Sequence, residues 1–168
     1  MADFESRCLD VFPQWLESLA DDARNVLGSV GDERLGPPSR QQLAGAVGYL
    51  LRSVGLIQDG IEDLGYLDDA CVLRVAAARA IALSGDPAAW DAGLLRLSEA
   101  ASLVRELLGE DYSRLEADVE RLAVHDLGGD FTHEFEQWAE SYVPPAWRRD
   151  PKNLVKFKSY VQHRLPEA

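Results

Sequence analysis

The 168-residue chain is strongly acidic, with 29 Asp and Glu residues against 17 Lys and Arg and a net charge of −12. Such a surface repels nucleic acid and anionic lipid at long range, which argues against nucleic acid as a partner. Hydrophobic residues make up 46% and charged residues 27%, a globular balance that argues against extensive disorder. No apolar run approaches the ~20 residues of a membrane span, and the N-terminus lacks the apolar region of a signal peptide. We therefore expect a soluble, cytoplasmic protein.

Abundant alanine and leucine, without alternating runs of β-branched and aromatic residues, predict an all-helical protein. The first helix is expected from about Asp3 to Leu27, where apolar residues recur at three- and four-residue steps. Pro13 lies inside this stretch and should kink or split the helix, because proline removes a backbone hydrogen bond. Glycines, a proline pair and charges predict a loop over residues 28–38.

The next two helices are expected to form the centre of the protein. One begins at Ser39, which forms a capping-box pattern with Gln42, and runs to near Gly55 with apolar residues on most sides. Its glycines should let a neighbouring helix approach closely. The other begins at Asp68 or Asp69 and runs to Ser84, and it is nearly all apolar. Together they predict a central apolar helix–corner–helix hairpin.

Four further helices are expected after this hairpin. Asp86-Pro87 is a strong start signal for a helix that ends near Leu108. Another covers about 112–125, a short one covers 132–142, and a last one follows Asp150-Pro151 and ends near Leu165. The sequence thus predicts an all-α fold, a single-domain bundle of about six to seven helices with short connections.

Basic charge is concentrated at the C-terminus. Residues 144–168 hold six bases, including all three lysines, against two acids, so this segment carries +4 and the preceding 143 residues carry −16. We expect an acidic helical bundle over 1–143 and a basic C-terminal helix over 144–168 that packs on the same domain. The alternative is a segment that binds a partner, through Trp147, Arg148, Arg149, Lys152 and Lys156, with Trp147 as the exposed anchor.

Five carboxylates crowd the segment LIQDGIEDLGYLDDACVL at residues 56–73: Asp59, Glu62, Asp63, Asp68 and Asp69. We favour a structural role, in which Asp68 caps the following helix and Gly65 turns the chain, because a helix N-terminus stabilises carboxylates. Two alternatives are a divalent-cation site, since Mg²⁺ and Ca²⁺ prefer oxygen ligands, and an edge that binds a partner. If Arg74 and Arg79 are buried in the following helix, they must pair, and these acids are candidates.

The stretch GYLDDACVL, residues 65–73, resembles the Gly-Tyr-x-Asp-Asp-x-x-Val-Leu core of the YkvA-like bacterial domain of unknown function. In the preceding SVGLIQDGIEDL, residues 53–64, Leu56, Ile57, Asp59, Ile61 and Leu64 also agree, whereas Ser53, Gln58 and Glu62 replace prolines. The resemblance covers about 25 of the 168 residues. It implies a helix–corner–helix hairpin and no particular activity.

A second, weaker metal candidate lies around a double glycine, where His125, Asp130, His133 and Glu134 fall within ten residues, together with Asp126. Histidines and carboxylates can bind Zn²⁺, but HEFEQ lacks the second histidine of HExxH. Helix capping by Asp130 or Thr132 is the simpler interpretation.

Two functions follow from these patterns. We favour a non-enzymatic interaction or scaffold protein, without a cofactor, that binds another protein or a second copy of itself. Its glycine-bearing apolar helices are the candidate surface for self-association. The alternative is a metal-dependent (Mg²⁺, Mn²⁺ or Zn²⁺) hydrolase-like enzyme that uses the acids at 59–69. No catalytic residue is assigned, because no nucleophile, P-loop or dinucleotide motif is present. Contact of the basic C-terminal helix with an anionic membrane is a third, weaker hypothesis.

Overall fold

The computed structural model describes residues 2–51, 64–85, 90–124 and 131–166. These residues form an all-α bundle, as the sequence predicts, and no strand occurs among them. In chain order the elements are α1 (Ala2–Glu17), α2 (Leu19–Val30), α3 (Pro37–Leu50), α4 (Leu67–Leu83), α5 (Ala92–Leu108), the 3-10 helix η2 (Gly109–Asp111), α6 (Tyr112–Leu122), α7 (Phe131–Ser141) and α8 (Lys152–Arg164). No helix in the described ranges is long and apolar enough to cross a membrane.

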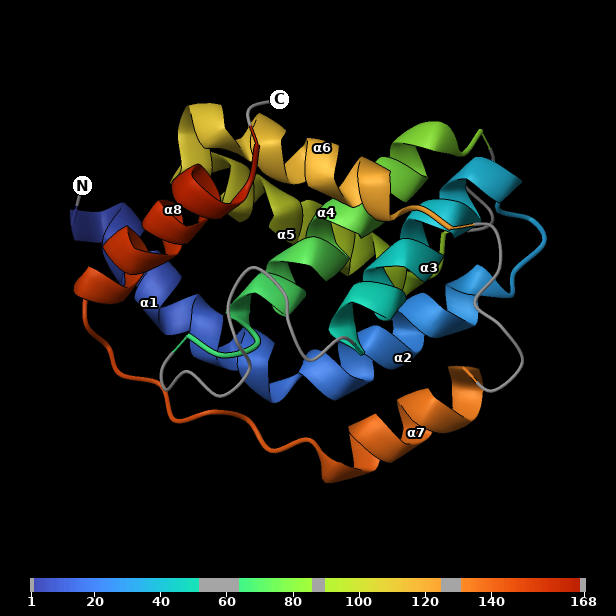
Figure 1. The fold of residues 1–168 in the computed structure, drawn as a ribbon, viewed down its shortest axis with the longest axis horizontal. Helices are drawn as coiled ribbons and strands as arrows, with labels where there is room; N and C mark the ends of the chain where they lie inside the picture. The colour runs from blue at the N-terminus through green and yellow to red at the C-terminus, as the bar shows by residue number, and fades with distance from the viewer. Residues whose placement is uncertain (1, 52–63, 86–89, 125–130, 167–168) are drawn as a thin grey trace.

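The centre of the bundle is formed by α3 and α4, which pack extensively on each other, while α5 packs on the other side of α4 (Figure 1). Both central helices are buried around most of their circumference because nearly all their side chains are apolar or small. Their burial makes self-association through the glycine-bearing apolar helices a poor fit. The corner between them, residues 52–63, lies outside the described residues.

The break between α1 and α2 falls at Ser18, and α1 continues through Pro13. The expected split at Pro13 is therefore wrong in position. The Ser18 hydroxyl donates a 2.7 Å hydrogen bond to Oδ2 of Asp22, in the first turn of α2. This hydrogen bond holds the buried carboxylate of Asp22 in place. The periodicity of apolar residues does not reveal such a contact, which is why the position of the helix break was not predicted.

The capping box predicted at Ser39 and Gln42 is also absent. Helix α3 begins two residues earlier, with Gly36 at the N-cap and prolines in the first turn. Both polar side chains are buried and make tertiary hydrogen bonds: Ser39 donates to the Ala80 carbonyl at 2.7 Å, and Gln42 donates to Glu120 at 2.9 Å. These bonds join α3 to α4 and to α6.

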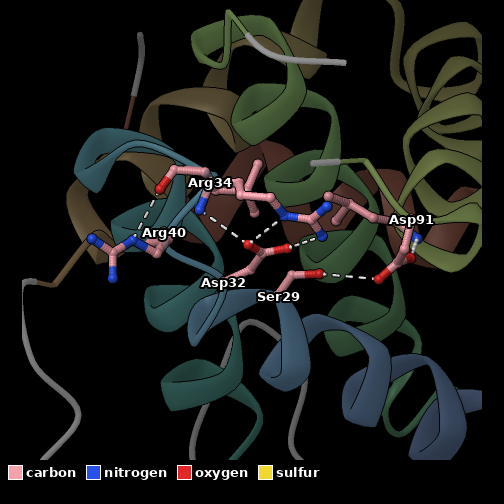
Figure 2. A network of polar contacts seen from close by, with 7 residues as sticks. Ser29, Asp32, Arg34, Arg40 and Asp91 are labelled. Carbon is pink, nitrogen blue, oxygen red and sulfur yellow. Dashed lines mark hydrogen bonds and ion pairs between the residues drawn. The ribbon is translucent and has the colours of Figure 1, made fainter. Parts of the chain in front are cut away.

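The loop between α2 and α3 is held by polar contacts shown in Figure 2. Asp32 accepts bonds from the backbone and guanidinium of Arg34, which lowers the pKa of this carboxyl group, and Arg40 donates to the carbonyl of the buried Leu35 at 3.1 Å. Ser29 donates to Asp91 at 3.4 Å, and Asp91 caps α5 by accepting from the Leu94 N–H at 2.7 Å. The predicted helix start at Asp86-Pro87 lies outside the described residues, and the helix described there begins at Ala92.

Helix α3 approaches the end of α6 at Gly45. A Cβ atom built there would overlap the backbone carbonyl of Leu122, whereas one at Gly48 would meet nothing within 4 Å. The close approach expected from both glycines therefore applies to Gly45, and Gly48 only weakens the helix.

Gly45→Ala should lower the free energy of unfolding by about 1–3 kcal/mol, because backbone of α6 must move to admit the methyl group. Gly48→Ala, three residues along the same helix, is the matched control and should raise stability by up to ~1 kcal/mol through helix propensity. Urea denaturation followed by circular dichroism measures both values. Equal effects of the two substitutions would contradict the packing described here.

Candidate functional site

The two aspartates of the GYLDD motif lie in the first turn of α4, where Asp68 is 1% and Asp69 is 3% exposed. Helix α4 begins at Leu67 and its N-cap residue is Tyr66, so the expected cap at Asp68 is wrong. The side chain of Asp68 instead accepts a 2.5 Å hydrogen bond from the Tyr49 hydroxyl, near the end of α3. Because carboxylates are almost never buried without partners, these aspartates mark a specific polar site inside the core.

Arg74, one and a half turns further along α4, is also buried and pairs with Asp22 of α2, with 3.1 Å between Nη2 and Oδ2. Its other terminal nitrogen donates to the Ala70 carbonyl at 2.9 Å, and its guanidinium lies 4.0 Å from the ring centroid of Trp15. The corner acids proposed as its partners are therefore replaced by an acid from another helix. Burial lowers the pKa of Arg74, and the negative charge of Asp22 opposes this decrease. The guanidinium nevertheless remains charged at any physiological pH.

We call Asp22, Asp68, Asp69 and Arg74 the buried charge cluster. Among the described residues, no three His, Cys, Asp or Glu side chains come together in a way that could hold a metal ion. Asp59, Glu62 and Asp63 lie outside the described residues. Within the described part, Arg74 forms an ion pair with Asp22, and the Tyr49 hydroxyl donates a hydrogen bond to Asp68.

An aromatic group packs on Tyr66, at the start of α4. Tyr66 packs edge-on against Tyr142 at 5.0 Å and near Trp138 at 6.3 Å, and both of these belong to α7 or follow it directly. The Tyr142 hydroxyl donates a 2.6 Å bond to the Leu16 carbonyl, and burial, with smaller contributions from Tyr66 and Asp69, raises the pKa of Tyr142. Tyr66, and not the expected Gly65, has the left-handed backbone (φ 68°), and no local sequence pattern indicates this role for a tyrosine.

The second metal candidate is divided between two regions. His133 and Glu134 are exposed on α7, and His125, Asp126 and Asp130 lie outside the described residues. The two cysteines, Cys8 and Cys71, are buried as expected, and burial raises the pKa of the Cys8 thiol to about 11. Both thiols are therefore protonated at neutral pH, which makes them poor nucleophiles.

The basic C-terminal segment returns from α7 along α1 to α8 (Figure 1). Trp147, expected to be an exposed anchor, is docked: its indole N–H donates to the Leu9 carbonyl at 3.1 Å and its ring meets Phe12 edge-on at 6.1 Å. Arg149 forms an ion pair with Asp10 at 2.9 Å. Of the five residues proposed to bind a partner, these two contact the protein's own first helix.

Helix α8 has one buried and one exposed face. Leu154, Phe157 and Val161 are in the common core, whereas Val155 is 68% exposed. An open hollow of about 530 Å³ lies on the outer face, and its described lining residues are Val155, Lys156, Ser159, Tyr160, His163 and Arg164. We call these residues, with Lys152 one turn earlier, the basic face. These residues recur at three- and four-residue steps in the sequence, a spacing that places them on one face of a helix and from which this surface could have been predicted.

No protein-family model, curated protein or solved structure matches the chain. The relation to the YkvA-like domain therefore stays a prediction, and the interpretation of both sites depends on their own geometry.

Removing either member of the buried ion pair should cost about 3–5 kcal/mol, because the remaining charge is left buried without its partner. We expect this for Asp22→Ala and for Arg74→Met, and the double variant should lose less than the sum of the two, by ~0.5–3 kcal/mol. Urea denaturation gives the complete double-mutant cycle. The exposed pair Arg7–Glu106, 3.2 Å apart, is the control and should couple by less than ~1 kcal/mol.

Proposed function

We propose that the protein is a non-enzymatic interaction module, and that the basic face of α8 binds an acidic segment of a partner protein. The observation that carries this proposal is the coincidence of exposed apolar surface with positive charge on one helix of an acidic chain. Val155 is 68% exposed beside Lys156 and Arg164, in a protein whose net charge is −12. A hollow with an aliphatic side chain in its lining and charged groups at its border resembles the apolar centre and polar rim of a docking site.

Charge complementarity supports an acidic partner. The basic face attracts carboxylates, whereas the remainder of the surface repels them, so the protein's field directs such a partner to α8. The hollow of about 530 Å³ lies in the size range of sites that enclose a ligand group. One apolar side chain of the partner can fill it against Val155 and Tyr160 while flanking acids reach Lys152 and Lys156.

The inner contacts of α8 support a preformed site. Its buried face packs on the core, Asn153 donates to the Arg148 carbonyl at 3.1 Å, and Gln162 donates to Asp111 at 2.9 Å. Because α8 is already held in place, it loses little conformational entropy when a partner binds to its outer face. This low cost favours binding of a flexible segment, which must itself become ordered. This arrangement suits binding better than catalysis.

Lys152→Glu/Lys156→Glu should weaken binding of a fluorescein-labelled helical peptide of glutamate and leucine at least tenfold, because two attractive contacts become repulsive. Fluorescence anisotropy at low and high salt measures the affinity, which should fall as salt rises. Lys158→Glu is the matched control. Lys158 is exposed on the same helix, but it is not among the described residues that line the hollow.

Two results would overturn the proposal. One is peptide binding in which Lys158→Glu costs half or more of the binding free energy that the double variant costs, since it makes half the charge change and such a result would reflect net charge alone. The other is the absence of binding at low salt. Flotation with anionic vesicles, in place of the peptide, tests the membrane hypothesis with the same variants.

The metal-dependent hydrolase alternative makes a separate prediction. If the acids at 59–69 bind an ion, Mg²⁺, Mn²⁺, Ca²⁺ or Zn²⁺ at 100 times its dissociation constant adds about 2.7 kcal/mol of stability. We expect no ion to raise the melting temperature, because Asp68 and Asp69 are buried and Asp68 already accepts a hydrogen bond from the Tyr49 hydroxyl. Thermal melts with each ion measure this. A saturable increase that Asp69→Asn removes would instead favour the enzyme.

A further inference from the structure

A second, smaller hollow lies on a different face, between the C-terminal end of α4 and the facing parts of α5 and α6. Its volume is about 190 Å³, and it is lined by Ala78, Arg79, Ala82, Leu83, Arg105, Tyr112 and Glu116. None of these residues belongs to the buried charge cluster or the basic face. Small alanine side chains form one wall, and Leu83, which is 51% exposed, forms the rim.

Arg79 is held in place from behind. Its Nε donates to Gln42 Oε1 at 3.0 Å, and one terminal nitrogen bonds Glu120, which Gln42 also contacts. Gln42 is buried, so this triad is anchored in the fold. A guanidinium has five N–H donors, and these two bonds leave others for a ligand in the hollow.

Arg105 and Tyr112 form the second cationic side. The guanidinium of Arg105 lies 4.8 Å from the centroid of the Tyr112 ring, which is buried. Burial raises the pKa of Tyr112 more than the nearby Arg105 lowers it, so the phenol keeps its proton and can donate to an anion. Two guanidiniums and a phenol together can bind a carboxylate.

Glu116 provides the opposite charge. It lies one turn after Tyr112 on α6, near enough to influence the phenol, and it forms no ion pair or hydrogen bond with any described residue. Arg79 keeps free N–H donors, but its charge is already paired with Glu120. Among the described lining residues, Arg105 and Glu116 are therefore the one positive and the one negative group that have no ion-pair partner. A ligand with one carboxylate and one ammonium group matches them, whereas a simple anion would leave Glu116 facing like charge.

The size of the hollow limits the ligand. At about 30 Å³ for each water molecule, 190 Å³ has room for about six waters, well below the ~300 Å³ of sites for drug-sized ligands. We propose that this hollow binds a small zwitterion of the α-amino-acid class, with its carboxylate on Arg79, Arg105 and Tyr112, its ammonium on Glu116, and a short aliphatic side chain against Ala78 and Ala82. This site is independent of the function proposed for α8.

The test is a titration of the full-length, isotope-labelled protein with L-valine, followed by amide NMR. Saturable shifts are expected at residues around the hollow, above all Ala82 and Tyr112. Arg105→Ala and Glu116→Gln should each weaken binding at least tenfold, because each removes the partner of one ligand charge. Arg7→Ala and Glu99→Gln, exposed residues outside the hollow, are the matched controls and should leave the affinity unchanged.

Acetate and methylammonium each carry half of the ligand's charge and should bind far more weakly than L-valine. The proposal is overturned if acetate binds as tightly as the amino acid, if millimolar L-valine shifts no amide near the hollow, or if Arg105→Ala binds normally. The amide spectrum of each variant shows directly whether it is folded, so lost binding is distinguished from lost structure.

Discussion

The ion pair between Asp22 and Arg74 is the constraint on which the arrangement of the helices depends. It joins α2 to the central helix α4, and both side chains are almost completely buried. A buried charge is costly, so each partner must lie where the other can reach it. Ser18, at the break between α1 and α2, and Trp15, above the guanidinium, complete the surroundings. The direction of the first two helices is thereby fixed relative to the core.

The same cluster bears on function. An acidic segment in a sequence suggests a place for a cation, but within the described residues Asp68 of that segment accepts a hydrogen bond from Tyr49, and the positive charge of Arg74 pairs with Asp22 of another helix. The charges that face solvent are arranged differently. Positive charge is concentrated on α8, and a balanced group of charges surrounds the hollow between α4, α5 and α6. The structure therefore separates charges that specify the fold from charges that can contact other molecules.

Much of the fold was predictable, because helical periodicity and apolar composition report directly on which segments are buried helices. The all-α class and the central α3–α4 pair were obtained in this way. The errors share one physical cause, which is that local rules cannot see partners distant in sequence. Ser39 and Gln42 have a capping pattern, but their bonds reach residues 41 and 78 positions away. Asp22, as the partner of Arg74, was missed for the same reason, and so was the docking of Trp147 on α1.

The backbone conformation of Tyr66 affects the order in which parts of the chain can fold. A left-handed backbone costs a non-glycine residue roughly 1–2 kcal/mol, and the rings that pack on Tyr66 come from the last third of the chain. Tyr142 also bonds Leu16, 126 positions earlier, and Trp147 bonds Leu9, 138 positions earlier. During synthesis the ribosome releases the amino-terminal helices first. The left-handed turn at Tyr66 and the backbone carbonyls of Leu9 and Leu16 gain these partners only after residues 138–147 have left the ribosome, so the amino-terminal helices cannot complete their packing before then.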